Sequence, residues 1–130
     1  MEEIENIAEK VKGLLAMLYP QAPVSVVNCG VNGSSASAGY ERLKRDVLAF
    51  SPDLLVVCFG LNDANAEMDG LETYKTALRN IFTTAREAGI EVIFMTPNML
   101  NTYSADDTYS GYKEYSYKTA EMQNSGRMLY

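Results

Sequence analysis

The strongest candidate for chemistry is a short polar motif that directly follows an apolar run. Residues 54–59 are apolar at every position, and Gly60-Leu61-Asn62-Asp63 comes next. If the run is a strand, the Asn62 side chain lies at the lip of a sheet, where its N–H can donate to the oxyanion that forms in acyl transfer. Gly, Asn and Asp are also common turn formers, so a plain turn is the alternative interpretation.

A second polar segment, residues 28–39, contains Gly30 and Gly33 among small residues. Glycine allows a peptide N–H to point into a cleft. Two alternatives stay open, a flexible turn and a phosphate or flavin-phosphate loop, since Gly33-Ser34-Ser35 precedes a predicted helix. The spacing matches neither the dinucleotide fingerprint nor the P-loop. Ser35 does not fit the Gly-x-Ser-x-Gly pattern of a nucleophile elbow either.

The sequence contains no histidine, which limits the reactions that these residues can perform alone. A self-contained Ser-His-Asp triad, a Cys-His pair and a His-ligated metal site are all excluded. The two cysteines, Cys29 and Cys58, are too few for a disulfide framework. We expect both to be free thiols that act as small core residues, and we expect no metal and no cofactor.

Hydrophobic periodicity predicts alternating helices and strands. Asp69 is expected to cap the third helix, with Glu72 three residues later, and Gly89 to end it. The uninterrupted apolar run is expected to be a strand covered on both faces. The alternation indicates βαβ units in an α/β fold with a parallel sheet. The expected helices are 3–19, about 40–50 and 71–88, and the expected strands are 24–27, 54–59 and 90–95.

The two polar loops, taken in order, resemble the SGNH hydrolases, also called the GDSL esterase/lipase family. In that family a small-residue loop after the second strand holds a glycine (block II), and Gly-x-Asn-Asp follows the third strand (block III). Here residues 27–35 resemble block II and residues 55–64 resemble block III. Ser51-Pro52-Asp53 before the block III strand, and Thr96-Pro97 after the next one, also resemble the family. The resemblance covers roughly residues 20–100.

The resemblance implies a three-layer α/β/α fold with a flavodoxin-like sheet and hydrolysis of carboxylic esters by an activated serine without a metal. It assigns Gly33 as a backbone donor and Asn62 as a side-chain donor to the oxyanion. Gly33 is preferred to Gly30 because it aligns with the block II glycine when Asn28 is placed at the strand end. Asp63 is expected to hold the loop rather than to take part in the reaction.

The chain departs from the family pattern in two places. Gly-Asp-Ser (block I) and Asp-x-x-His (block V) do not occur in it. We therefore expect residues 1–130 to be a single SGNH-like domain truncated at both ends, with an incomplete sheet and no activity alone. The gap left by the missing first strand suggests self-association, because unpaired buried backbone groups each cost about 1–3 kcal/mol. A non-catalytic interaction domain remains an alternative.

Composition restricts the partners of the chain. A formal charge of −6 argues against nucleic-acid binding, and the longest apolar runs are far too short to span a membrane. No signal-peptide pattern opens the sequence, which slightly favours a cytoplasmic location. The expected partner is a small ester or acylated substrate.

Two features near the end of the sequence are expected to be structural. Asp106-Asp107 is expected to be a solvated loop. A tyrosine-rich segment is expected to pack onto the domain: Tyr103, Tyr109, Tyr112, Tyr115 and Tyr117.

Overall fold

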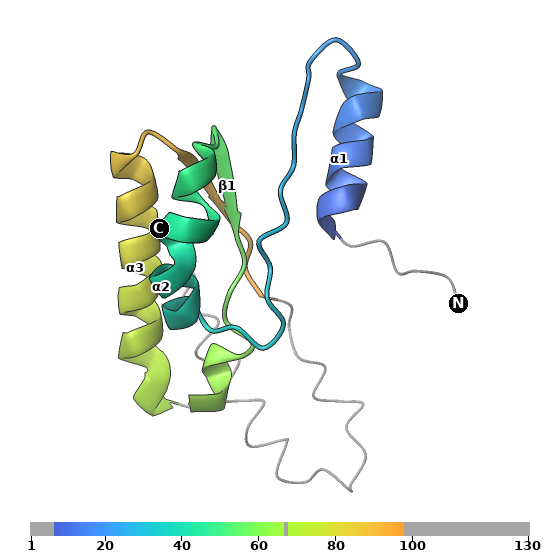
Figure 1. Ribbon diagram of the computed structural model, residues 1–130. Coiled ribbons are helices and arrows are strands. Elements are labelled where there is room, and N and C mark those ends of the chain that lie inside the picture. Colours follow the sequence, from blue (N-terminus) through green and yellow to red (C-terminus); the bar gives the residue numbers. More distant parts are fainter. Residues whose placement is uncertain (1–6, 67, 98–130) are drawn as a thin grey trace, which may run out of the picture. The chain divides into compact units, whose positions relative to one another are not determined.

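The computed structural model describes residues 7–66 and 68–97 (Figure 1). The chain divides after Gly30 into two compact units, Met1–Gly30 and Val31–Tyr130. The predictions for the tyrosine-rich segment and for Asp106-Asp107 lie outside the described residues. No helix in the described part of the chain is long and apolar enough to cross a membrane.

In the described part of the first unit there is one helix, α1, which spans Ile7–Leu18. Its apolar residues recur at helical spacing, as the sequence predicts, and Pro20 follows its end. None of its residues is buried. Ile7, Leu14 and Leu18 are each more than half exposed, so α1 presents an exposed apolar stripe.

The strand predicted over residues 24–27 is wrong: residues 23–30 form neither helix nor strand. Val24 and Val27, expected to be buried, are exposed. A strand is completed only by hydrogen bonds to a neighbouring strand, and in the described residues the one ladder joins two other segments. The β-branched residues of the 24–27 segment are therefore not sufficient for a strand, because no neighbouring strand pairs with it in the described residues.

The second unit contains a two-stranded parallel sheet formed by β1 (Leu54–Val57) and β2 (Glu91–Phe94). The register pairs Leu54 with Glu91 and Val57 with Phe94. The connection between the strands passes through the 3₁₀ turns η2 (Asp63–Ala66) and η3 (Met68–Gly70) and the helix α3 (Leu71–Glu87). This confirms an α/β fold with a small parallel sheet, although the described residues form two strands rather than the three predicted.

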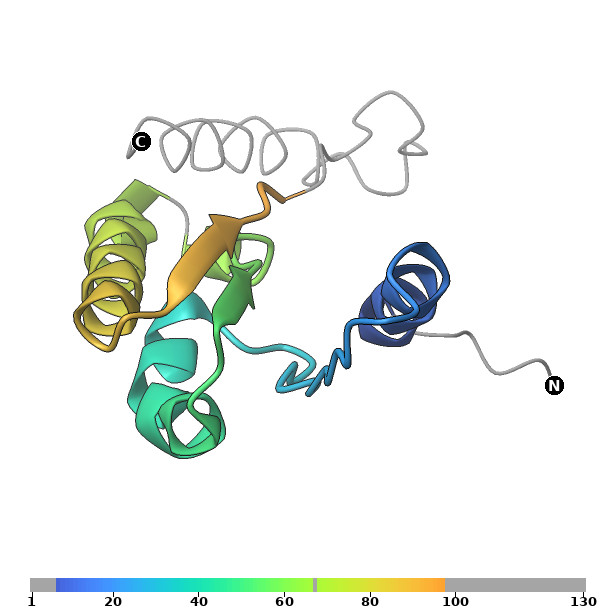
Figure 2. The same ribbon diagram turned by 90° about the horizontal axis from the view of Figure 1, so that it is seen from above.

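The core lies between one face of this sheet and two helices, α3 and α2 (Ala36–Asp46), which lie side by side in Figures 1 and 2. Leu55 and Val57 of β1 contribute to it, as do Val92 and Phe94 of β2. The strand residues between them point to the opposite face and stay about half exposed. The fully buried cluster consists of Ala36, Leu43, Val57, Ala64, Tyr74, Ala77, Leu78 and Ile81.

The expectation that the 54–59 strand is covered on both faces is therefore wrong for the described residues. Leu54, Val56 and Ile93 form an apolar surface, with exposed fractions of 46%, 51% and 51%. The strand is also shorter than its apolar run, because it ends at Val57. Successive strand residues alternate between faces, and an apolar run cannot show which face has found a partner.

Helix α2 begins at Ala36, four residues before the predicted start, and ends at Asp46. The 3₁₀ turn η1 (Leu48–Phe50) follows it. Residues 36–39, predicted as loop, form the first turn of this helix, which the Ser35 side chain caps. A Cβ at Gly39 would lie 2.3 Å from Cζ of Phe59, so only glycine fits at this contact. The small residues serve packing here, not loop flexibility.

We predict that Ser35→Ala destabilises the fold by about 1 kcal/mol. Ser35 is the N-cap of α2, and its Oγ accepts a hydrogen bond from the Ala38 N–H at 3.3 Å. Urea unfolding of the chain measures the loss. Ser37→Ala is the matched control, since Ser37 lies inside the helix, where alanine is at least as favourable. Equal stability of the two variants would contradict the capping role.

For the third helix, the predicted N-cap is wrong and the predicted C-terminal glycine is confirmed. Asp69 is not the N-cap, because Gly70 occupies that position without a side-chain hydrogen bond. The η3 turn continues directly into α3, which begins at Leu71 as predicted, so only the capping residue differs. Gly89 does follow the end of the helix with a positive φ of 75°, as expected for a C′ glycine.

Candidate active site

The candidate site lies where β1 passes into the 60–66 loop. Gly60 has a φ of 141°, and a Cβ there would lie 2.5 Å from Cγ of Pro97 and 3.1 Å from the Tyr74 hydroxyl. The Ala64 N–H donates to the Gly60 carbonyl at 3.0 Å and closes the turn that carries Asn62. Only glycine allows the chain to leave the strand so close to Pro97.

Tyr74 supports this turn from α3. Its ring is fully buried, and its hydroxyl donates to the Phe59 carbonyl at 3.0 Å. The sequence places Tyr74 on the inner stripe of the helix but gives no sign of this hydrogen bond. The presence of a tyrosine on an otherwise apolar stripe could have indicated such a hydrogen bond, because a buried phenol hydroxyl usually has a hydrogen-bond partner.

The block II segment forms a tight turn over Val31–Ser34. The Ser34 N–H donates to the Val31 carbonyl at 3.1 Å, and Gly33 at the third position has a φ of 75°. A positive φ at that position is typical of a type II turn, which requires glycine there. The turn is closed by Ser34, and the Gly33 N–H takes no part in that closing bond.

A hydrogen bond joins the two predicted site segments. The Asn62 side-chain nitrogen Nδ2 donates to the Ser34 carbonyl at 3.1 Å, and Ser34 directly follows Gly33. A carboxamide carries two N–H donors, so one of them can fix its position while the second serves a ligand. Asn62 is exposed to solvent. The fold thus brings the segments of Gly33 and Asn62 together.

Asp63 holds the start of α2, in agreement with the sequence-based expectation. Its Oδ1 accepts from the Ala36 N–H at 2.9 Å, and the residue is buried. A carboxylate at a helix N-terminus also interacts favourably with the helix dipole. Burial raises the pKa of Asp63 above its usual value, and the N–H groups that hydrogen-bond to it oppose this shift.

We predict a pH-dependent stability difference between the wild type and Asp63→Asn. The raised pKa means that the folded state binds the proton more tightly than the unfolded state, whose pKa stays near 3.8. The wild type therefore loses stability relative to the variant as the pH rises above 3.8. The carboxamide of the variant keeps an oxygen acceptor for the Ala36 N–H but does not titrate. Urea unfolding of both proteins across this range measures the difference, and a constant difference would contradict the prediction.

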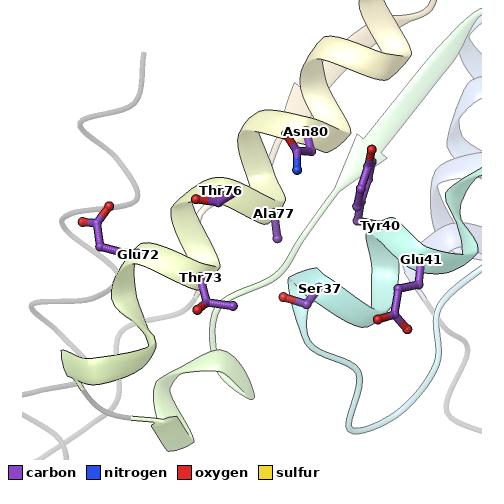
Figure 3. Close-up of a pocket in the computed structure, with 8 residues that line it drawn as sticks. All are labelled: Ser37, Tyr40, Glu41, Glu72, Thr73, Thr76, Ala77 and Asn80. Atoms are coloured by element: carbon purple, nitrogen blue, oxygen red, sulfur yellow. The ribbon is translucent and has the colours of Figure 1, made fainter.

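Two shallow hollows adjoin at this end of the unit. One, of about 440 Å³, is lined by Asn62, Asp63 and Tyr74 together with residues of both loops and of α3. The other, of about 400 Å³, lies between α2 and α3 (Figure 3). Ser37 and Thr73 line both. The first hollow is the candidate substrate site because it contains Asn62.

Neither cysteine belongs to the buried core. Cys29 is partly exposed and Cys58 is exposed, so the expectation of two core thiols is wrong. Val57 is the inward residue of β1, and Cys58, the next along the chain, is exposed. Within residues 7–66 and 68–97 no cluster of side chains could hold a metal ion.

Comparison with known proteins gives consistent results. A sequence model of the GDSL-like lipase/acylhydrolase family matches residues 7–125. An acetylxylan esterase from Geobacillus stearothermophilus is 30% identical over 96 residues, which are 67% of this chain and 44% of that protein. The crystal structure of Axe2, an acetylxylan esterase from the same organism, superimposes with a TM-score of 0.65 at 24% identity and covers 91% of this chain and 58% of its own.

A second solved structure, the acetyl xylan esterase AlAXEase, has a TM-score of 0.65 at 16% identity, over 92% of this chain and 64% of its own. At these identities the structures show the fold alone. The matched region spans 44% to 64% of the length of these relatives.

Proposed function

The chain belongs to the GDSL-like lipase/acylhydrolase family, and from this premise we propose that it supplies the oxyanion-binding part of a serine ester hydrolase. The Gly33 N–H and the second N–H of the Asn62 amide are the two donors. The observation that carries the proposal is the Asn62–Ser34 hydrogen bond, because it holds the Asn62 carboxamide beside the Gly33 turn.

The proposed reaction is hydrolysis of a carboxylic ester. A serine Oγ attacks the ester carbonyl carbon, and the carbonyl oxygen becomes the oxyanion that Gly33 and Asn62 stabilise. A histidine takes the serine proton and passes it to the departing alcohol, and water then releases the acyl group. The 130 residues contain no histidine and no Gly-Asp-Ser. In this proposal other residues supply the serine and its base, and we expect no ester turnover by these residues alone.

A short acyl group, acetyl in the first instance, is the proposed substrate class. The support for this class is the acetylxylan esterase that is 30% identical to this chain over 96 residues. The flavin- or phosphate-binding alternative gains no comparable support. Hydrolysis of acetylated oligosaccharides and of longer acyl esters by the whole protein, compared at equal concentration, tests this preference. Faster turnover of long acyl chains would contradict it.

Residues 1–130 are proposed to be the central part of one three-layer α/β/α domain. The uncovered face of the sheet, with Leu54, Val56 and Ile93 about half exposed, is the surface on which a third layer packs in such a fold. The same surface explains why the isolated chain should self-associate. Sedimentation of the isolated chain is expected to show species larger than a monomer, and a single monomeric species with a cooperative melt would contradict this.

Sequencing the DNA on both sides of this reading frame tests the proposed function. We expect an apolar strand ending in Gly-Asp-Ser upstream and an Asp-x-x-His motif downstream. The protein with those flanks should hydrolyse 4-nitrophenyl acetate, and the 130 residues alone should not. Start and stop signals that bound the 130 residues with neither motif nearby, or serine-dependent turnover by these residues alone, would overturn the proposal.

A further inference from the structure

The acceptor that fixes Asn62 is a backbone carbonyl, so the position of Ser34 determines the position of the Asn62 amide. The neighbours of Ser34 are each fixed by another contact. Ser35 caps α2, and Ala36 donates to Asp63. The side chain of Ser34 has two contacts: its Oγ accepts from Nη2 of Arg42 at 3.4 Å and donates to the Ser35 carbonyl at 3.4 Å.

Arg42 is itself held in place from the C-terminal side. Its Nη1 donates to Oδ2 of Asp46 at 3.1 Å, one helical turn further along α2. Both side chains are largely buried, with 16% and 20% exposed. Hydrogen bonds from Arg45 and then from Arg42 lower the pKa of Asp46 to about 2, so its carboxylate is charged at neutral pH. Asp46, Arg42, Ser34 and Asn62 form a continuous chain of contacts.

Helix stability alone does not explain this arrangement. Helical side chains lean toward the N-terminus, and here that direction carries the Arg42 guanidinium back to the residue before the N-cap. A cation is favoured at the opposite end of a helix, where the dipole is negative. Burying part of a guanidinium also costs free energy unless it is paired. These costs are consistent with a role for Arg42 at the loop.

We propose that Arg42 is a positioning residue for the oxyanion site: it fixes the Ser34 turn and, through the Ser34 carbonyl, the Asn62 amide. This inference rests on the proposed function for its kinetic consequence but not for its structural one. A donor displaced by a fraction of an ångström no longer meets the oxyanion well, so the effect should fall on kcat and leave KM nearly unchanged.

The kinetic test uses the whole protein that carries these residues. Arg42→Ala and Ser34→Ala are each expected to lower kcat for 4-nitrophenyl acetate about tenfold. Arg45→Ala is the matched control, because Arg45 also pairs with Asp46 but is 77% exposed and reaches no loop residue that the structure describes. Its kcat should stay within about twofold of the wild type.

A double-mutant cycle separates positioning from a general effect. In an Asn62→Ala background, Arg42→Ala should lower kcat no further, because the amide that it positions is gone. A further tenfold loss in that background, an unchanged kcat in Arg42→Ala, or an equal loss in Arg45→Ala would each overturn the proposal. Ser34→Ala removes the hydroxyl that Arg42 contacts and keeps the carbonyl that Asn62 contacts. It therefore tests the Arg42–Ser34 contact even if Arg42→Ala fails to fold.

A second readout does not depend on activity. In the 130-residue chain, the side-chain amide protons of Asn62, identified by their loss in Asn62→Ala, exchange with water at a rate that reports their hydrogen bond. Arg42→Ala and Ser34→Ala should accelerate this exchange, and Arg45→Ala should not. Unchanged exchange in both would overturn the positioning role. If Asn62→Ala leaves kcat unchanged while exchange responds as expected, the proposed function fails and the positioning role stands.

Discussion

Asn62→Ala lowers kcat for aryl acetate hydrolysis by about 10²–10³-fold in the whole protein, if the amide is an oxyanion donor. The carboxamide is exposed, is fixed by the Ser34 carbonyl at 3.1 Å, and retains one N–H for a ligand. The charge on the carbonyl oxygen is larger in the transition state than in the bound ester. The lost donor therefore affects kcat more than KM.

Steady-state kinetics on the purified variant measures this effect. Asn80→Ala is the matched control, because Asn80 lines the neighbouring hollow between α2 and α3 and is assigned no part in the reaction. Its kcat should stay near that of the wild type. Asn62→Asp should lose at least as much activity as Asn62→Ala, since a carboxylate offers no N–H and repels the oxyanion. Wild-type kcat in either Asn62 variant would contradict the donor role.

Gly60→Ala is expected to destabilise the fold by about 2–4 kcal/mol. Two costs combine at this position. The φ of 141° is one that residues with a Cβ rarely adopt, and the new methyl group would lie 2.5 Å from the Pro97 ring. Because the Pro97 ring and the Tyr74 hydroxyl both lie against Gly60, the strain acts on the turn that carries Asn62.

Gly89→Ala separates the two costs. Gly89 also has a positive φ, 75°, but a Cβ there would meet nothing within 4 Å. This control should lose only about 1–2 kcal/mol, the cost of the left-handed backbone. Urea unfolding of the chain measures both variants. Equal losses in Gly60→Ala and Gly89→Ala would show that the close approach of Pro97 is not a constraint.

Much of the site could be predicted from the sequence because its signals are local. An apolar run followed by Gly60-Leu61-Asn62-Asp63 predicts a strand that ends in a polar turn, and β1 with its loop confirms it. The role of Asp63 as a structural anchor is also confirmed. The assignment of Gly33 and Asn62 as oxyanion donors stays a prediction, although a hydrogen bond joins their segments.

The remaining features depend on tertiary contacts that a sequence pattern does not contain. The start of α2 is held by Asp63, which accepts from the Ala36 N–H across 27 residues of sequence, and small residues in a polar context are equally typical of a loop. The 24–27 segment has the composition of a strand without a partner in the ladder that the structure describes. The sequence analysis did not identify Arg42, because Arg42 and Ser34 are eight positions apart. Side-chain pairs on a helix are sought at spacings of three or four residues.

The central claim is that Gly33 and Asn62 together bind the oxyanion, and a structure of the whole protein phosphonylated on its serine tests it most directly. A phosphonate ester places a phosphoryl oxygen where the oxyanion forms. We expect that oxygen about 2.7–3.1 Å from both the Gly33 nitrogen and Nδ2 of Asn62. A phosphoryl oxygen bound by other donors, with Gly33 and Asn62 pointing away from it, would contradict the account.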